Sequence, residues 1–271
     1  MRDYGVESMV NSLLFVVLLT VIIHAAETLS YAVRYAGVKM NKIAVALSLT
    51  GIIVLISRTA NMLQALTTGH FVDHARTDAT FDILGYFRIV LFAASIGTLI
   101  AIALFPTFVP LCGRIIARLE VTGSIPKLLS SVTLGQLKNA KRYIKRPRIR
   151  LSSFRYLGIP KRFIFLNVAV TAFYTVGVIS ALYAAHLVPA LSTTASQTSG
   201  IINGIATVLL TIFIDPQLGL IMDKATKDET AKSQLGKIYT LLMVSRFFGT
   251  LLAQLLIVPA AYLIITIVKL I

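Results

Sequence analysis

Long apolar runs alternate with shorter polar segments along most of the chain. Six runs are long enough to cross a bilayer, because a spanning helix needs about 20 mostly apolar residues. They cover residues 9–33, 43–66, 83–105, 163–187, 197–222 and 238–268. The last run is long enough to be tilted, or to be broken at Pro259. The pattern therefore predicts an all-α polytopic membrane protein with about six transmembrane helices.

Composition supports the same fold class. Hydrophobic residues make up 56% of the 271 positions and charged residues only 14%, against about 25% charged residues in soluble proteins. An ordinary soluble domain is excluded. We expect a single membrane domain over residues 1–271, with one three-helix half at 1–105, a basic segment at 106–162 and a second half at 163–271.

Basic residues alternate from loop to loop and predict the orientation. Segments 34–42, 106–162 and 223–237 are rich in Lys and Arg, and 106–162 holds 13 of them. Segment 67–82 has Arg76 alone, and 188–196 is uncharged. Cytoplasmic loops carry the excess of Lys and Arg, so both termini are predicted outside the cell.

An even split of six helices gives the two halves opposite orientations, which is the geometry of an inverted repeat, common in transporters. Gly97-Thr98-Leu99 followed by Pro106 is echoed by Gly249-Thr250-Leu251 followed by Pro259. The echo favours a 3+3 repeat, although apolar sequences of low complexity also produce such matches by chance.

The basic segment combines apolar and cationic positions. Leu129, Leu134, Leu137 and Ile144 alternate with lysines and arginines, a pattern typical of an amphipathic helix in the inner headgroup layer. Residues 145–150 add a dense cationic patch. The patch is either the orientation signal alone or a device that gathers anionic lipid headgroups. Nucleic-acid binding is disfavoured, because no recognition fold accompanies the charge.

Arginines within or beside the apolar runs are the main candidates for function. A guanidinium stays charged in proteins, and placing one in hydrocarbon costs about 3 kcal/mol on insertion scales. Several such charges suggest a water-filled or ligand-filled cavity that takes an anion. The candidates for binding a pyrophosphate group are Arg34, Arg58, Arg88 and Arg246.

Other polar residues inside the runs are expected to line the same cavity. They are His24, Glu27, Asn61, Gln64, Asn203, Asp215 and Gln254. Two carboxylates neutralise at most two of the four arginines, so a pyrophosphate would supply the missing charge through fork-shaped contacts. The structural alternative is that Arg246 pairs with Asp215 or Glu27 to join helices, while Arg34 and Arg88 reach the headgroups.

Several motifs are distinctive as a set. They are Glu27-Thr28-Leu29-Ser30-Tyr31 with Arg34, the stretch 42–49, Ser57-Arg58-Thr59-Ala60-Asn61, Gly97-Thr98-Leu99, Asp215-Pro216 and residues 246–251. With these motifs the chain resembles the Amj family of bacterial lipid II flippases, over its whole length and most closely at residues 24–62. The resemblance implies translocation of undecaprenyl-pyrophosphate-linked disaccharide pentapeptide, from the inner to the outer leaflet of the plasma membrane, for peptidoglycan synthesis.

Two other functions remain as alternatives at this point. One is transport of a small anion or a proton-coupled solute, and the other is a non-transporting membrane scaffold of envelope synthesis. No phosphate-cradling GxxxxGK[ST] motif or other catalytic signature is present, so we expect no enzyme, no catalytic residues, no cofactor and no resident metal. Six spans enclose little volume, which favours a homodimer.

Overall fold

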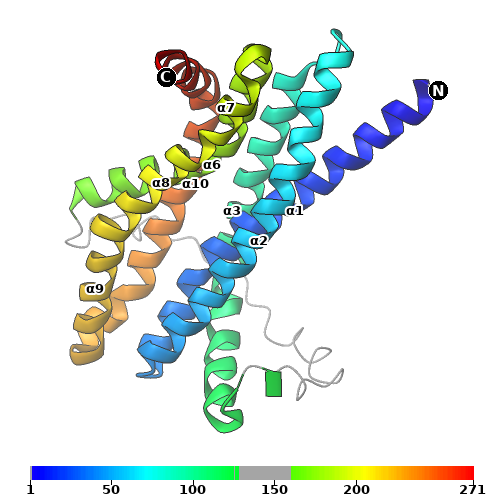
Figure 1. Ribbon diagram of the computed structural model, residues 1–271. Coiled ribbons are helices and arrows are strands. Elements are labelled where there is room, and N and C mark those ends of the chain that lie inside the picture. The colour runs from blue at the N-terminus through cyan, green and yellow to red at the C-terminus, as the bar shows by residue number, and fades with distance from the viewer. Residues whose placement is uncertain (1, 125, 128–159) are drawn as a thin grey trace.

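The structure is a computed structural model that describes residues 2–124, 126–127 and 160–271. These residues are almost entirely helical and contain no strand (Figure 1). The long helices are α1 (Arg2–Lys39), α2 (Ile43–Thr77), α3 (Ile83–Thr122), α6 (Lys161–Leu187) and α10 (Glu229–Leu270). The fifth crossing is divided into a 3-10 turn (Pro189–Leu191), α7 (Ser192–Gln197), α8 (Ser199–Leu209), a π turn (Leu210–Ile214) and α9 (Asp215–Lys227).

All six predicted spans are confirmed, because six helical segments of the described chain are long and apolar enough to cross a membrane. The apolar run that ends at residue 105 does not mark the end of its helix. Helix α3 continues through Pro106 and Pro110 to Thr122, so residues 106–122 belong to the helix. Proline is tolerated in membrane helices when neighbouring groups satisfy the freed carbonyl. The predicted amphipathic helix at 129–145 and the cationic patch at 145–150 lie outside the described residues.

Two other prolines have different effects on their helices. Helix α10 runs unbroken through Pro259, so of the two alternatives for this run the break is absent. In the fifth crossing the backbone widens into a π turn at Leu210–Ile214, directly before Asp215 and Pro216. Pro216 has no N–H to donate to the preceding turn and its ring crowds that carbonyl, which accounts for the change of helix type at this point.

The helices form two groups that meet along the centre of the molecule (Figure 1). In the first half, α1 packs extensively on α3 and on α2; in the second half, α6 packs on α10 and on α8. The halves join mainly through α3 against α10, with smaller contacts between α2 and α6 and between α1 and α10. Both termini lie at the same end, as an even number of crossings requires (Figure 1).

The two glycines of the sequence echo hold equivalent places in this arrangement. A Cβ on Gly97 would lie 2.5 Å from the backbone oxygen of Val21 on α1. A Cβ on Gly249 would lie 2.7 Å from the backbone oxygen of Val168 on α6. Each glycine thus permits the close contact between the first and third long helix of its own half, as small residues do in membrane bundles. This equivalence supports the inverted repeat, which stays a prediction.

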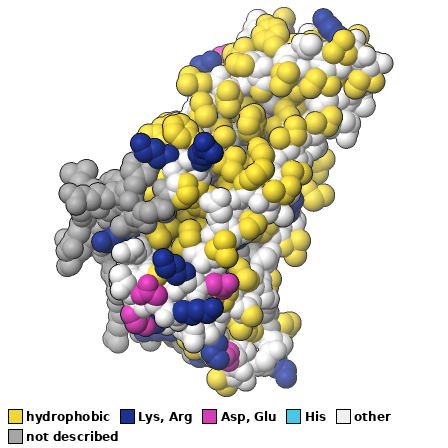
Figure 2. Space-filling model, turned by 90° about the vertical axis from the view of Figure 1, so that its left-hand side faces the viewer, with side chains coloured by type: hydrophobic (Ala, Val, Ile, Leu, Met, Phe, Trp, Pro, Cys, Tyr) yellow, Lys and Arg dark blue, Asp and Glu magenta, His cyan; other side chains and the backbone are white. Residues whose placement is uncertain are grey.

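On the face that Figure 2 shows, apolar side chains dominate over much of the height, and most charged side chains gather toward one end. Large exposed side chains include Leu55, Leu66, Phe165, Leu220 and Leu255. On a soluble protein such a continuous apolar surface would mark an interaction site. In a protein with six spans it is the surface that faces lipid.

Candidate functional site

Two ion pairs connect the halves, and both involve α1. The first joins an Arg246 guanidinium nitrogen on α10 to Glu27 Oε2 on α1 at 2.9 Å. The side chains are only 14% and 32% exposed. Ser57 on α2 donates to Glu27 Oε1 at 2.8 Å, and Arg246 Nε donates to Thr28 Oγ1 at 3.3 Å. One carboxylate therefore ties together three helices.

The second pair lies two helical turns further along α1. An Arg34 nitrogen is 3.5 Å from Asp215 Oδ1, and their side chains are 17% and 41% exposed. Asp215 is the first residue of α9 and directly follows the π turn, and its backbone N–H donates to the carbonyl of Leu210. Residues seven apart share a helix face, so Glu27 and Arg34 present one face of α1 to the second half. We call this face and its partners Arg246 and Asp215 the ion-paired interface.

The other two arginines are placed differently. Arg58 on α2 and Arg88 on α3 are exposed, and neither forms an ion pair with any residue that the structure describes. The backbone oxygen of Arg88 accepts from Gln254 Nε2 at 2.8 Å. Two of the four arginines, Arg34 and Arg246, thus have carboxylate partners, and Arg58 and Arg88 have none among the described residues. For Arg246 this is the alternative in which it pairs with Glu27 to join helices.

A small polar cavity lies beside the ion-paired interface, between α1, α2, α3 and α6. Its volume is about 40 Å³, which is room for about one or two water molecules at about 30 Å³ each. Four predicted polar residues line it together, namely His24, Glu27, Asn61 and Gln64. The amide of Gln64 donates to Thr20 Oγ1 at 2.7 Å, whereas the buried Nδ1 of His24 has no hydrogen-bond partner among the residues that the structure describes.

The remaining predicted polar residues lie elsewhere. Asn203 on α8 packs on Gly177 of α6, where a Cβ would come within 2.3 Å of its amide oxygen. Asp215 belongs to the second ion pair, and Gln254 caps a carbonyl of α3. These three do not line the small cavity. The expected cavity is therefore lined by four of the seven predicted polar residues, not by all of them.

Sequence reasoning missed the two hydroxyl groups that contact the first ion pair. Ser57 and Thr28 each contact one member of the first ion pair, but hydroxyl residues are common in membrane helices and carry no charge signal. A usable signal was the spacing on α2. Ser57 and Gln64 are seven apart and both buried, which marks them, rather than Arg58, as the inward face of that helix.

The pyrophosphate-binding assignment needs space that this conformation does not provide at the ion-paired interface. Ligand pockets usually measure about 300–1,000 Å³, far above the 40 Å³ of the polar cavity. An anion could reach Arg246 or Arg34 only if the halves separate and the carboxylates give way. In this conformation the halves are in contact at both ion pairs.

Six membrane-crossing helices in two packed halves, joined by partly buried ion pairs, define a multi-pass α-helical membrane protein. The family described as Amj, Alternate to MurJ, matches residues 19–268. The chain is 40% identical over 262 residues to lipid II flippase Amj of Bacillus subtilis (strain 168), covering 96% of this chain and 97% of that relative. No solved structure matches. The chain belongs to the Amj family.

Proposed function

We propose that this protein is a flippase that moves lipid II, a polyprenyl-pyrophosphate-linked peptidoglycan precursor, from the inner to the outer leaflet of the bacterial plasma membrane. The observation that carries the proposal is the ion-paired interface in a chain whose 40% identical relative is named a lipid II flippase. That name also favours a lipid substrate over the soluble-anion and scaffold alternatives.

The chemistry of the exchange follows from charge and geometry. A pyrophosphate carries more negative charge than a carboxylate, and the planar guanidinium binds its oxygens in pairs. Pyrophosphate bound at Arg246 displaces Glu27, which retains the hydrogen bond from Ser57. Breaking the pair removes a contact between α1 and α10 and so favours separation of the halves. On the other side of the cycle, Glu27 recovers Arg246 and releases the anion.

In the predicted orientation, with both termini outside, the four arginines lie at positions across the membrane that the headgroup would contact. Arg34 lies nearest the cytoplasmic end, Arg246 lies deeper beside Glu27, Arg58 lies at about the same level because the preceding Ser57 contacts Glu27, and Arg88 lies near the outer end. The headgroup passes from Arg34 to Arg246 between the halves, and the exposed Arg58 and Arg88 receive it where it leaves that interface, while the polyprenyl tail stays in lipid. The membrane potential assists an anion moving outward by about 2.3 kcal/mol per charge per 100 mV, so hydrolysis of a nucleotide is not required.

The test is complementation in bacterial cells whose growth depends on this protein for lipid II translocation. Arg246→Ala and Arg58→Ala should abolish growth at wild-type protein levels. Lys232→Ala is the matched control, because it removes a cation of α10 that pairs with Glu229 in an exposed position. Normal growth of both arginine variants at wild-type protein levels would remove arginine binding of pyrophosphate from the mechanism.

A further inference from the structure

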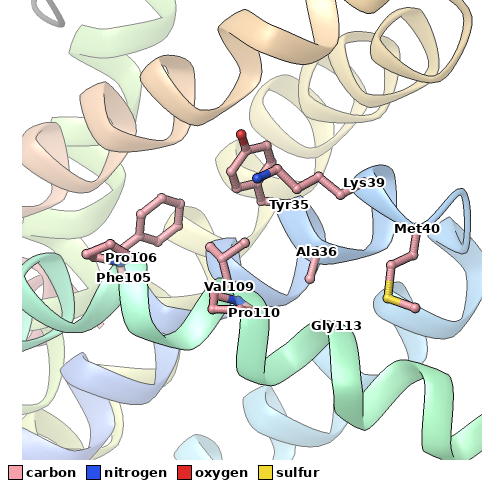
Figure 3. A pocket seen from close by; sticks show the side chains of 9 residues that line it. All are labelled: Tyr35, Ala36, Lys39, Met40, Phe105, Pro106, Val109, Pro110 and Gly113. Carbon is pink, nitrogen blue, oxygen red and sulfur yellow. The ribbon is translucent and has the colours of Figure 1, made fainter. Parts of the chain in front are cut away.

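A second, larger pocket lies between α1 and α3, apart from the ion-paired interface. Its volume is about 440 Å³, within the range of about 300–1,000 Å³ of ligand sites. Figure 3 shows its lining, which comes from Tyr35, Ala36, Lys39 and Met40 on α1 and from Phe105, Pro106, Val109, Pro110 and Gly113 on α3. We call it the α1–α3 groove.

The groove exists because one face of α3 lacks long side chains. Pro106, Pro110 and Gly113 are spaced by four and three residues, so they stack on a single face of the helix. Neither a proline ring nor a glycine fills the space that a leucine would occupy there. The two prolines, which lie beyond the apolar run 83–105, therefore build one wall of the groove.

The lining is apolar except for one cation. Lys39 lies in the last turn of α1, and its Nζ is 4.5 Å from the centre of the Tyr35 ring, a cation–π contact. The Tyr35 ring in turn stacks on Phe105, with centroids 6.1 Å apart. An ammonium group is thus held beside an apolar groove, which suits a ligand with an anionic end and a hydrocarbon body.

The groove and the ion-paired interface lie next to each other on α1. Tyr35 directly follows Arg34, whose guanidinium pairs with Asp215 on the adjoining side of α1. Tyr35 also contacts α10, because a Cβ on Gly236 would lie 3.0 Å from the Tyr35 hydroxyl. The same turn of α1 therefore carries a wall of the groove and the first arginine of the proposed path.

We propose that the α1–α3 groove binds the isoprene units of the substrate next to its pyrophosphate, with Lys39 contacting a phosphate oxygen. This inference rests on the proposed function and names the subsite that receives the lipid tail. Arg34 lies within one turn and takes the same headgroup when Asp215 releases it. The groove holds the head end of the tail, and the rest of the tail stays in the bilayer.

The test is photo-crosslinking with a polyprenyl pyrophosphate that carries a benzophenone on its first isoprene units. Wild-type protein in nanodiscs should be labelled within residues 35–40 and 105–113, as located by mass spectrometry. Excess undecaprenyl pyrophosphate should suppress the label, and excess phosphatidylglycerol should not. Labelling elsewhere, no specific labelling, or equal competition by phosphatidylglycerol would overturn the proposal.

Variants provide an independent readout. Gly113→Phe fills the groove, and its Cβ meets only the flexible Met40 sulfur at 3.3 Å; it should reduce labelling by about tenfold or more, as expected for loss of a buried apolar contact. Gly51→Phe is the control, because Gly51 on α2 faces open space. If Gly113→Phe does not fold, Gly113→Leu replaces it. Unchanged labelling of the filled groove contradicts the inference.

The two proposals fail separately. Lipid II translocation by reconstituted wild-type protein tests the function without reference to the groove. If translocation occurs and the label lies outside residues 35–40 and 105–113, the tail subsite is wrong and the flippase stands. If translocation does not occur, the proposed function fails whatever the groove binds.

Discussion

Replacing Glu27 by Gln separates a substrate-exchange role from a purely structural one. The amide still accepts the hydrogen bond from Ser57 but no longer offers Arg246 a negative charge. A hydrogen bond to a charged group contributes about 1.5–3 kcal/mol, and the 32% exposure of Glu27 places this pair, at 2.9 Å, toward the lower end. We therefore assign about 1.5–2 kcal/mol to the competition between Glu27 and pyrophosphate.

That free energy sets the size of the expected effect. Removing the competitor should tighten binding of lipid II by about 10- to 30-fold, since 1.4 kcal/mol corresponds to a factor of ten. Turnover should fall, because no carboxylate returns to displace the anion from Arg246. The two changes have opposite signs, which a loss of stability alone does not produce.

The assay is equilibrium binding of labelled lipid II to protein in nanodiscs, together with translocation in proteoliposomes. Glu229→Gln is the matched control, because it changes a carboxylate on α10 that pairs with Lys232 at 3.0 Å but is 87% exposed. It should bind and translocate as wild type does. Binding by Glu27→Gln that is unchanged or weaker, in folded protein, would refute the exchange mechanism.

Three more predictions concern packing, the second ion pair and orientation. Gly97→Ala and Gly249→Ala should each lower the free energy of unfolding by about 1–3 kcal/mol, because the added Cβ meets a backbone oxygen. Denaturant titration in detergent measures this free energy. Asp215→Asn should change stability by less than about 1 kcal/mol, since the pair is long and half exposed, yet should slow translocation in proteoliposomes. Cysteine at Thr80 should react with an impermeant maleimide from outside intact cells, and cysteine at Ser233 only after permeabilisation.

Each of these three predictions has a control or an outcome that would contradict it. Gly51→Ala adds a Cβ in open space and should leave stability unchanged; equal losses at all three glycines would contradict the close-packing argument. Wild-type translocation by Asp215→Asn would exclude a role for the second pair. For the labelling, the buried native Cys112 is replaced by Ala, and the reversed pattern of reactivity would reverse the orientation.

The spans were predictable because hydrophobic length is a property of consecutive residues. The residues at which the helices end were less predictable. Pro106 reads as a helix end, but in a membrane helix the cost of a missing N–H depends on neighbours that sequence does not reveal. At Pro216 the backbone does respond, with a π turn, while at Pro259 it does not. The same residue type thus gives two outcomes, an unbroken helix at Pro106 and Pro259 and a π turn before Pro216, and tertiary packing decides between them.

The candidate site was predictable in its chemistry but not in its pairing. Glu27 and Arg246 were candidates because charge is rare inside apolar runs, and the structure brings them together. Asn203 and Gln254 had similar sequence contexts, yet helix rotation places them away from the polar cavity. Rotation about the helix axis depends on contacts between distant segments, such as Gly97 on Val21, so local sequence does not determine it.

The most direct test of the central claim is transbilayer movement of labelled lipid II in proteoliposomes that contain only this protein, measured by access of an impermeant reagent to the headgroup. The account predicts that wild-type protein makes lipid II in both leaflets accessible with time, and that Arg246→Ala protein, present in equal amount and folded, does not. Movement at the rate of protein-free liposomes with the wild type, or equal rates for wild type and Arg246→Ala, would contradict it.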